Sequence, residues 1–195
     1  SLLPKYRGRT PHVWSIINNE KFTGITTHYI TEKCDEGDII LQKKIPINRD
    51  DTGYSILMKF SKLYPQIIIK TIELCLTNTV TRKIQNNNFA TYFPKRKPSD
   101  GEIDWNWGKE RIRNWVRALS YPYPGAYTFY QNKKITIDKV SLSKISYNIN
   151  LENGYILKTK PNLLIKTKNG VIKIDEIRKN TVKFVSKKIF KNEYR

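Results

Sequence analysis

The sequence contains very little cysteine and histidine. Among its 195 residues there are only two cysteines, Cys34 and Cys75, and two histidines, His12 and His28. Neither pair has the spacing of a zinc site, and two cysteines do not build a disulfide framework. We therefore expect no metal, and we interpret both cysteines as small buried apolar side chains.

Long hydrophobic segments are also missing. No apolar run approaches the roughly 18 residues that a membrane-spanning helix requires, and the N-terminus lacks a hydrophobic signal sequence. We therefore expect a soluble, cytoplasmic protein without a membrane partner. The chain opens on the apolar run Ser1-Leu2-Leu3-Pro4 without an initiator methionine, so we expect further sequence upstream.

Acidic residues are scarce relative to basic ones, 17 against 36, which gives a net charge of +19. Such an excess is typical of proteins that bind nucleic acid or another anionic surface. Abundant lysine, isoleucine and asparagine, with only three alanines, is also typical of an AT-rich genome. Residues 1–95 carry a net charge of +6 and the remainder +13, so the excess lies mainly in the C-terminal part.

The N-terminal part has the pattern of an α/β layer. Thr10 and Pro11 predict the start of a helix that ends near Asn19. Runs rich in β-branched residues predict strands over residues 25–31 and 39–47. A long helix is expected over residues 53–78, kinked at Pro65. Its predicted apolar face comprises Leu57, Phe60, Tyr64, Ile67, Ile68 and Ile72.

The C-terminal part predicts a small antiparallel barrel. A polar, proline-containing linker is expected over residues 86–98, followed by a helix over residues 108–119. Short strand-like runs separated by turn residues favour a barrel, with a hairpin turn expected at Gln131-Asn132. The predicted strands cover residues 126–130, 134–142, 154–159, 163–167, 171–177 and 181–185.

The loop between the first two predicted strands concentrates acidic side chains. Polar groups removed from water cost free energy unless they are paired, so this concentration beside buried strands singles out Asp35 as a candidate for chemistry. Its neighbours Glu32, Glu36 and Asp38 are interpreted as solvated turn residues.

Several motifs together resemble the folate-dependent formyltransferases, whose members act on glycinamide ribonucleotide, methionyl-tRNA or amino-sugar nucleotides. The motifs are SLLPKYRGRTP, WSIINNEKFTGITTHYITEKCDEGDIILQ, FPKRKPSDGEIDW and RALSYPYPGAYTFY. The resemblance implies the C-terminal portion of a Rossmann-like catalytic domain over residues 1–90 and a linker over residues 91–104. A helix and an antiparallel β-barrel of the OB-like type would follow over residues 105–195.

The resemblance also implies a catalytic trio in which Asp35 is the aspartate. The partner asparagine and histidine would precede Ser1, and His12 and His28 match other family positions. The co-substrate would be 10-formyltetrahydrofolate, and the backbone of the loop before Asp35 would line its pterin pocket. The residues expected to bind it are Ile30, Thr31, Glu32, Lys33 and Cys34.

Details of the motifs favour a small-molecule acceptor, a dTDP- or UDP-linked 4-amino sugar. Sugar-type members resemble the segment RGRTPHVW and have a histidine like His28 after TGxT. Arg7 and Arg9 are candidates for a nucleotide pyrophosphate, with pairing to a local carboxylate as the alternative. Trp14 and Tyr123 are further candidate substrate residues, with packing as their alternative.

Two other functions remain open. A methionyl-tRNA formyltransferase would use its basic barrel to contact tRNA, and its binding would weaken steeply with salt. A truncated or non-catalytic binding module is the third interpretation. We expect residues 1–195 alone to be inactive in formyl transfer and to fold poorly as a monomer, and a homodimer is an open alternative for the assembly.

Overall fold

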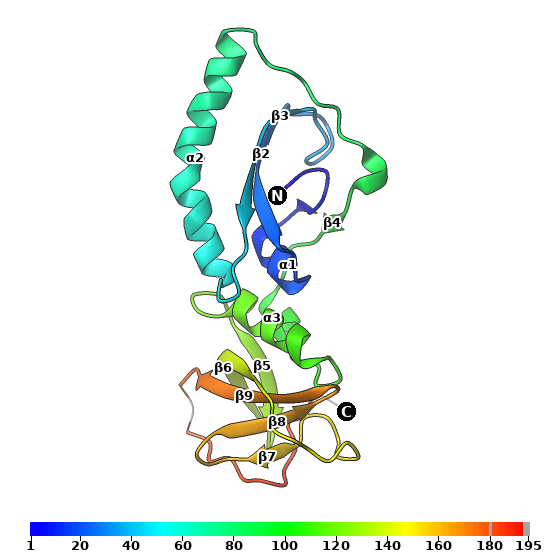
Figure 1. The fold of residues 1–195 in the computed structure, drawn as a ribbon, viewed down its shortest axis with the longest axis vertical. Coiled ribbons are helices and arrows are strands. Elements are labelled where there is room, and N and C mark those ends of the chain that lie inside the picture. Colours follow the sequence, from blue (N-terminus) through cyan, green and yellow to red (C-terminus); the bar gives the residue numbers. More distant parts are fainter. Residues whose placement is uncertain (180, 193–195) are drawn as a thin grey trace. The chain divides into compact units, whose positions relative to one another are not determined.

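The computed structural model describes residues 1–179 and 181–192, which form two compact units (Figure 1). The first unit covers residues 1–96 and the second begins at Lys97. Each is described by itself below. Within the described residues no helix has the length and apolar character needed to cross a membrane.

The first unit is built on an antiparallel pair of strands, β2 (Phe22–His28) and β3 (Ile39–Pro46). Both were predicted, although β2 begins and ends about three residues earlier than expected. Thr23 lies opposite Ile45, and both side chains are buried. A short helix, α1 (Pro11–Ile17), and the long helix α2 (Gly53–Leu76) contact this pair.

Helix α2 begins at a capping box, in which the side chain of Thr52 accepts from the Ser55 N–H and the Ser55 hydroxyl accepts from the Thr52 N–H. The predicted apolar face is only partly correct. Phe60 is buried, but Ile68 and Ile72 are 50% and 52% exposed. Only a narrow stripe of α2, which includes Ile56, Phe60 and Ile67, is buried. Apolar side chains beside that stripe are therefore exposed to solvent.

The predicted linker contains ordered structure. Strand β4 (Tyr92–Phe93) pairs in parallel with β1 (Arg7–Gly8). The rings of Tyr6 and Phe93 stack at 4.9 Å. A 3-10 turn, η1 (Asn87–Phe89), precedes β4. Residues 87–93 therefore belong to the first unit, and β4 lies beside its N-terminal strand β1.

The prediction that both cysteines are buried is wrong. Cys34 is exposed in the loop between β2 and β3, and Cys75 is exposed in the last turn of α2. Both lie in segments that face solvent: residues 30–34 are all exposed, and Leu76 beside Cys75 is 78% exposed.

The second unit is a five-stranded antiparallel sheet next to helix α3 (Lys109–Leu119), with a 3-10 turn, η2 (Pro98–Gly101), before them. The strand order is β5-β6-β9-β8-β7. Gln131 and Asn132 both have positive φ, 48° and 61°, and form the predicted hairpin turn between β5 and β6. The strands are β5 (Ala126–Tyr130), β6 (Lys133–Ser143), β7 (Ile156–Lys158), β8 (Leu163–Thr167) and β9 (Gly170–Ile177).

A single segment connects the two edges of this sheet. Lys191 forms a bridge with Phe129 on β5, and Ile189 forms one with Tyr155, which precedes β7. The sheet is therefore curled toward a barrel, and its core includes the stacked rings of Trp105 and Phe190, 5.4 Å apart. Residues 181–185, predicted as a strand, form none; residues 189–191 make the edge contacts instead.

Candidate active site

Asp35 lies on the loop between β2 and β3 and is held from two sides. Its Oδ2 accepts a hydrogen bond of 2.9 Å from the backbone N–H of Gly8, and its Oδ1 lies 3.6 Å from Nε2 of His28. The residue has a φ of 60°, in the left-handed region that few non-glycine residues adopt. A carboxylate with 30% of its side chain exposed can still reach a reacting group in solvent.

His28 faces acceptors with both ring nitrogens. Nδ1 lies 2.8 Å from the carbonyl oxygen of Tyr29, and Nε2 faces Asp35. The contact ties the end of β2 to Asp35.

Gly37 sets the shape of the loop behind Asp35. A Cβ atom at this position would lie 1.7 Å from the carbonyl oxygen of Tyr29. No other residue fits without movement of the backbone. The loop therefore approaches the end of β2 more closely than a side chain would allow.

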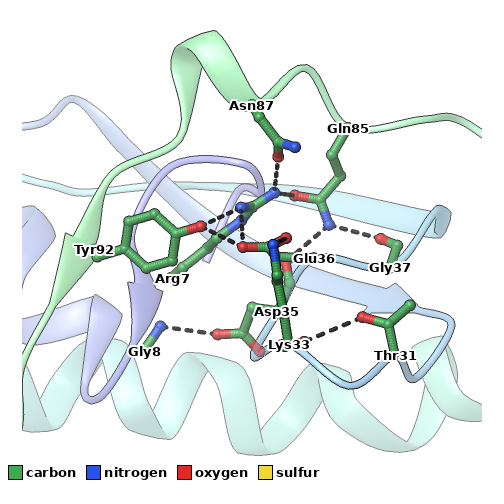
Figure 2. A network of polar contacts seen from close by, with 10 residues as sticks. All are labelled: Arg7, Gly8, Thr31, Lys33, Asp35, Glu36, Gly37, Gln85, Asn87 and Tyr92. Atoms are coloured by element: carbon green, nitrogen blue, oxygen red, sulfur yellow. Dashed lines mark hydrogen bonds and ion pairs between the residues drawn. The ribbon is translucent and has the colours of Figure 1, made fainter.

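A buried guanidinium lies directly behind this loop, as Figure 2 shows. The side chain of Arg7 has no exposed surface. Its Nη1 donates to the hydroxyl of Tyr92 at 2.6 Å and lies 3.3 Å from Oε1 of Glu36. Its Nη2 donates to the side-chain oxygens of Gln85 and Asn87, each at 2.8 Å. We refer to Arg7, Glu36, Gln85, Asn87 and Tyr92 as the Arg7 cluster.

Two predictions are affected by the Arg7 cluster. The buried position of Arg7 favours the alternative considered from the sequence, pairing with a local carboxylate, over contact with a pyrophosphate. Glu36 is not a solvated turn residue, because 21% of its side chain is exposed and it pairs with Arg7 and Tyr92. Arg9 is exposed and remains available to an anion.

The predicted substrate residues belong to both units. Trp14 is half-buried, donates from Nε1 to the carbonyl oxygen of Pro94 at 3.3 Å and carries Arg96 over its ring. Tyr123 belongs to the second unit, where its carbonyl oxygen accepts from Arg178 at 3.1 Å. The first unit therefore holds Arg7, Arg9 and Trp14.

The predicted folate-binding loop is open to solvent. Residues 30–34 are all exposed, and Ile30 is 95% exposed. Among the residues that the structure describes, no three His, Cys, Asp or Glu side chains are grouped so that they could hold a metal ion.

Gln85, Asn87 and Tyr92, which contact the Asp35 loop or Arg7, were not predicted as site residues. They fall in and around the polar segment that was interpreted as a linker. One local signal could have indicated ordered structure here. The aromatic pair Tyr92-Phe93 favours a strand, although the surrounding stretch is polar.

Comparison with known proteins identifies two family domains in the chain. Residues 1–72 match the model described as formyl transferase, and residues 95–195 match the model for the formyl transferase C-terminal domain. The second match alone covers more than half of the chain.

Curated relatives come from two kinds of protein. The chain is 42% identical over 174 residues to a bifunctional polymyxin resistance protein ArnA of Wigglesworthia glossinidia brevipalpis, covering 89% of this chain and 26% of that protein. It is 38% identical over 190 residues to a methionyl-tRNA formyltransferase of Thermodesulfovibrio yellowstonii, covering 97% of this chain and 60% of that protein. The chain thus spans less than two thirds of either relative.

Solved structures give a similar result. An N-formyltransferase from Helicobacter canadensis, in complex with folinic acid and dTDP-3-aminofucose, has a TM-score of 0.72 at 25% identity, over 89% of this chain and 63% of that one. The sugar 3N-formyl transferase WlaRD, with dTDP and 5-N-formyl-THF, has a TM-score of 0.70 at 26% identity, over 90% of this chain and 64% of that one. From the two domain matches and this shared fold, we conclude that the chain belongs to the formyl transferase family.

Proposed function

We propose that the protein containing this chain transfers the formyl group of 10-formyltetrahydrofolate to the amino group of a nucleotide-linked amino sugar. The observation that carries the proposal is the placement of Asp35. Its carboxylate is fixed by the Gly8 N–H at 2.9 Å and directly follows the exposed segment of residues 30–34. Folate would bind along that segment.

The chemistry requires a group that accepts and returns a proton. The acceptor amine attacks the formyl carbon and forms a C–N bond, which leaves a tetrahedral oxyanion and a positively charged amine. Asp35 accepts the amine proton through an ordered water, and the proton passes to N10 of the folate as the bond from N10 to the formyl carbon breaks. Donors to the oxyanion would be the asparagine and histidine that the resemblance expects before Ser1.

The sugar acceptor is supported by the folate- and dTDP-containing structures with which the chain shares its fold. Exposed Arg9 supports it as well, because a guanidinium binds phosphate oxygens in bidentate fashion. The OB-like assignment of the curled C-terminal sheet and a cytoplasmic location form part of the same proposal.

Methionyl-tRNA is the second candidate acceptor. Its support is the 38% identity to a methionyl-tRNA formyltransferase over 97% of this chain. The higher positive charge of the C-terminal part, net +13 beyond residue 95, also suits a polyanion.

The test is a formylation assay of the complete protein with 10-formyltetrahydrofolate. Separate reactions would contain dTDP-amino sugars, UDP-amino sugars and methionyl-tRNA at matched concentrations. A kcat/KM for one sugar nucleotide far above that for tRNA is expected. Preference for tRNA, with an affinity that falls steeply between low and physiological salt, would replace the first proposal by the second.

A further inference from the structure

We propose that Gln85 is a positioning residue for Asp35, and that Arg7 fixes the orientation in which Gln85 acts. The inference rests on the proposed function in assuming that Asp35 takes part in formyl transfer. Gln85 lies between the two family matches, which end at residue 72 and resume at residue 95, so those matches give it no role.

One amide group holds the loop on both sides of Glu36. Nε2 of Gln85 donates to the backbone carbonyl oxygen of Asp35 at 2.9 Å and to that of Gly37 at 2.6 Å. Gln85 itself is only 6% exposed. Both bonds cross to a loop about 50 residues earlier in the chain, as Figure 2 shows.

Arg7 determines which way the Gln85 amide points. Because a guanidinium only donates, Nη2 of Arg7, at 2.8 Å, requires the oxygen of the amide and not its nitrogen. The NH2 group is thereby directed at the two carbonyl oxygens. A rotated amide would place donor against donor at Arg7 and acceptor against acceptor at the loop, which leaves buried polar groups unpaired.

The loop has a conformation that needs such support. Asp35 has a φ of 60°, and the Cβ-free Gly37 lies against the carbonyl oxygen of Tyr29. A non-glycine residue in the left-handed region persists where surrounding contacts hold it. Since Gln85 binds the carbonyl groups of both Asp35 and Gly37, its loss frees the backbone that directs the carboxylate.

A matched pair of substitutions distinguishes the positioning of Asp35 by Gln85 from the loss of one hydrogen-bond acceptor of Arg7. Gln85→Met removes one acceptor from Nη2 of Arg7 and both bonds to the loop. Asn87→Leu removes the other acceptor of the same nitrogen, at 2.8 Å, and leaves the bonds of Gln85 to the loop in place. Each replaces an amide by an apolar side chain of similar size.

The assay uses the complete protein, the preferred acceptor and 10-formyltetrahydrofolate. We expect Gln85→Met to lower kcat about ten- to a hundredfold with little change in the KM of the acceptor, because a misplaced catalytic group affects the transition state. We expect Asn87→Leu to change kcat by less than about threefold, within the range of a peripheral contact. Equal kcat values for the two variants would overturn the proposal.

A second variant covers the case in which Gln85→Met does not fold. Gln85→Glu keeps an acceptor for Arg7 but presents oxygens instead of donors to the carbonyl groups of Asp35 and Gly37. It should therefore lower kcat as Gln85→Met does, while its ion pair with Arg7 offsets part of the cost of opposing oxygens at the loop. Unimpaired kcat in Gln85→Glu would also overturn the proposal.

Amide hydrogen exchange over residues 30–38 provides a readout that does not depend on activity. Faster exchange in Gln85→Glu than in Asn87→Leu would support the positioning role, and equal exchange would refute it. If the protein formylates none of the acceptors, the proposed function fails on the activity assay alone. The exchange comparison then still decides whether Gln85 orders the loop.

Discussion

Asp35 accepts a hydrogen bond from the backbone N–H of Gly8 at 2.9 Å, although 27 residues separate the two. The bond requires only an acceptor at Oδ2 and no negative charge. An asparagine at position 35 can keep it while losing the ability to take up a proton. This allows the chemistry of the carboxylate to be separated from its structural contact.

Asp35→Asn should therefore fold normally and lose activity. We expect kcat to fall about a hundredfold or more, the range lost when a general acid–base group is removed. The measurement is steady-state formylation, with circular dichroism to verify the fold. Glu73→Gln, an exposed charge change on α2, is the control, and wild-type activity in Asp35→Asn would exclude a role for this carboxylate.

His28 should act through Asp35. Its Nε2 lies 3.6 Å from Oδ1 of that residue, and contacting residues give non-additive effects when both are changed. We expect His28→Phe to reduce kcat/KM in the wild-type background and to have little further effect in the Asp35→Asn background. The double-mutant cycle compares kcat/KM for the wild type, the two single variants and the double variant. If the double variant loses the product of the two single losses, the two residues act independently.

Gly37→Ala should disrupt the Asp35 loop. The added Cβ would meet the carbonyl oxygen of Tyr29 at 1.7 Å, and we expect a loss of at least about 2 kcal/mol in the free energy of unfolding. Urea denaturation measures this loss. Gly170→Ala is the control, because its Cβ would meet only the flexible side chain of Lys109 at 2.8 Å; similar losses in both variants would contradict the prediction.

His12 should make the protein less stable in mild acid. Burial lowers the pKa of His12 from 6.5 to about 4. The unfolded chain therefore takes up this proton first, so stability is complete above pH 6.5 and falls as the pH decreases toward 4. At pH 5 the expected loss from this residue is about 2 kcal/mol.

His12→Leu should remove that dependence. The quantity to measure is the difference in unfolding free energy between pH 7.5 and pH 5, for the variant and for the wild type. An unchanged difference in the variant would assign the acid sensitivity to other groups.

Asp51 should stabilise the start of α2 at neutral pH. Lys59 Nζ lies 2.6 Å from its carboxylate, and the Ser55 hydroxyl and the Asn48 N–H donate at 2.8 and 2.7 Å. Burial alone would raise the pKa of this carboxyl, but the three donors hold it below 3.8. The stabilisation is therefore present above pH 3.8 and is lost as the pH falls through the lowered pKa.

Asp51→Asn should cost about 1–3 kcal/mol of unfolding free energy at pH 7. The difference from wild type should shrink at pH values below the lowered pKa, because the wild-type carboxyl is then also uncharged. Denaturation curves at a series of pH values from 7 downward make the comparison. A difference that does not change with pH would show that the charge of Asp51 contributes nothing.

Elements whose pattern is local were predictable from the sequence. The hairpin strands, the long helix from Gly53 and the turn at Gln131-Asn132 each follow from periodicity or turn chemistry within a few residues. Asp35 was found because its loop is short and acidic. Its role, however, came from the resemblance to a family and not from the pattern.

The Arg7 cluster could not be predicted in this way. Arg7 meets Gln85 across 78 residues and Tyr92 across 85, and no local rule pairs residues at such separations. A buried arginine also looks identical in sequence to an exposed one. Strand β4 was missed for the same reason, since its two residues are ordered by pairing with β1.

The two exposed cysteines allow ligand binding to be followed by alkylation. Cys34 directly precedes Asp35 in the loop proposed to bind folate, whereas Cys75 lies in the last turn of α2. A ligand that covers the loop would slow alkylation of Cys34, and Cys75 would serve as the internal reference in the same sample. Mass spectrometry of the alkylated protein could then report folate occupancy without a fluorescent label or an acceptor.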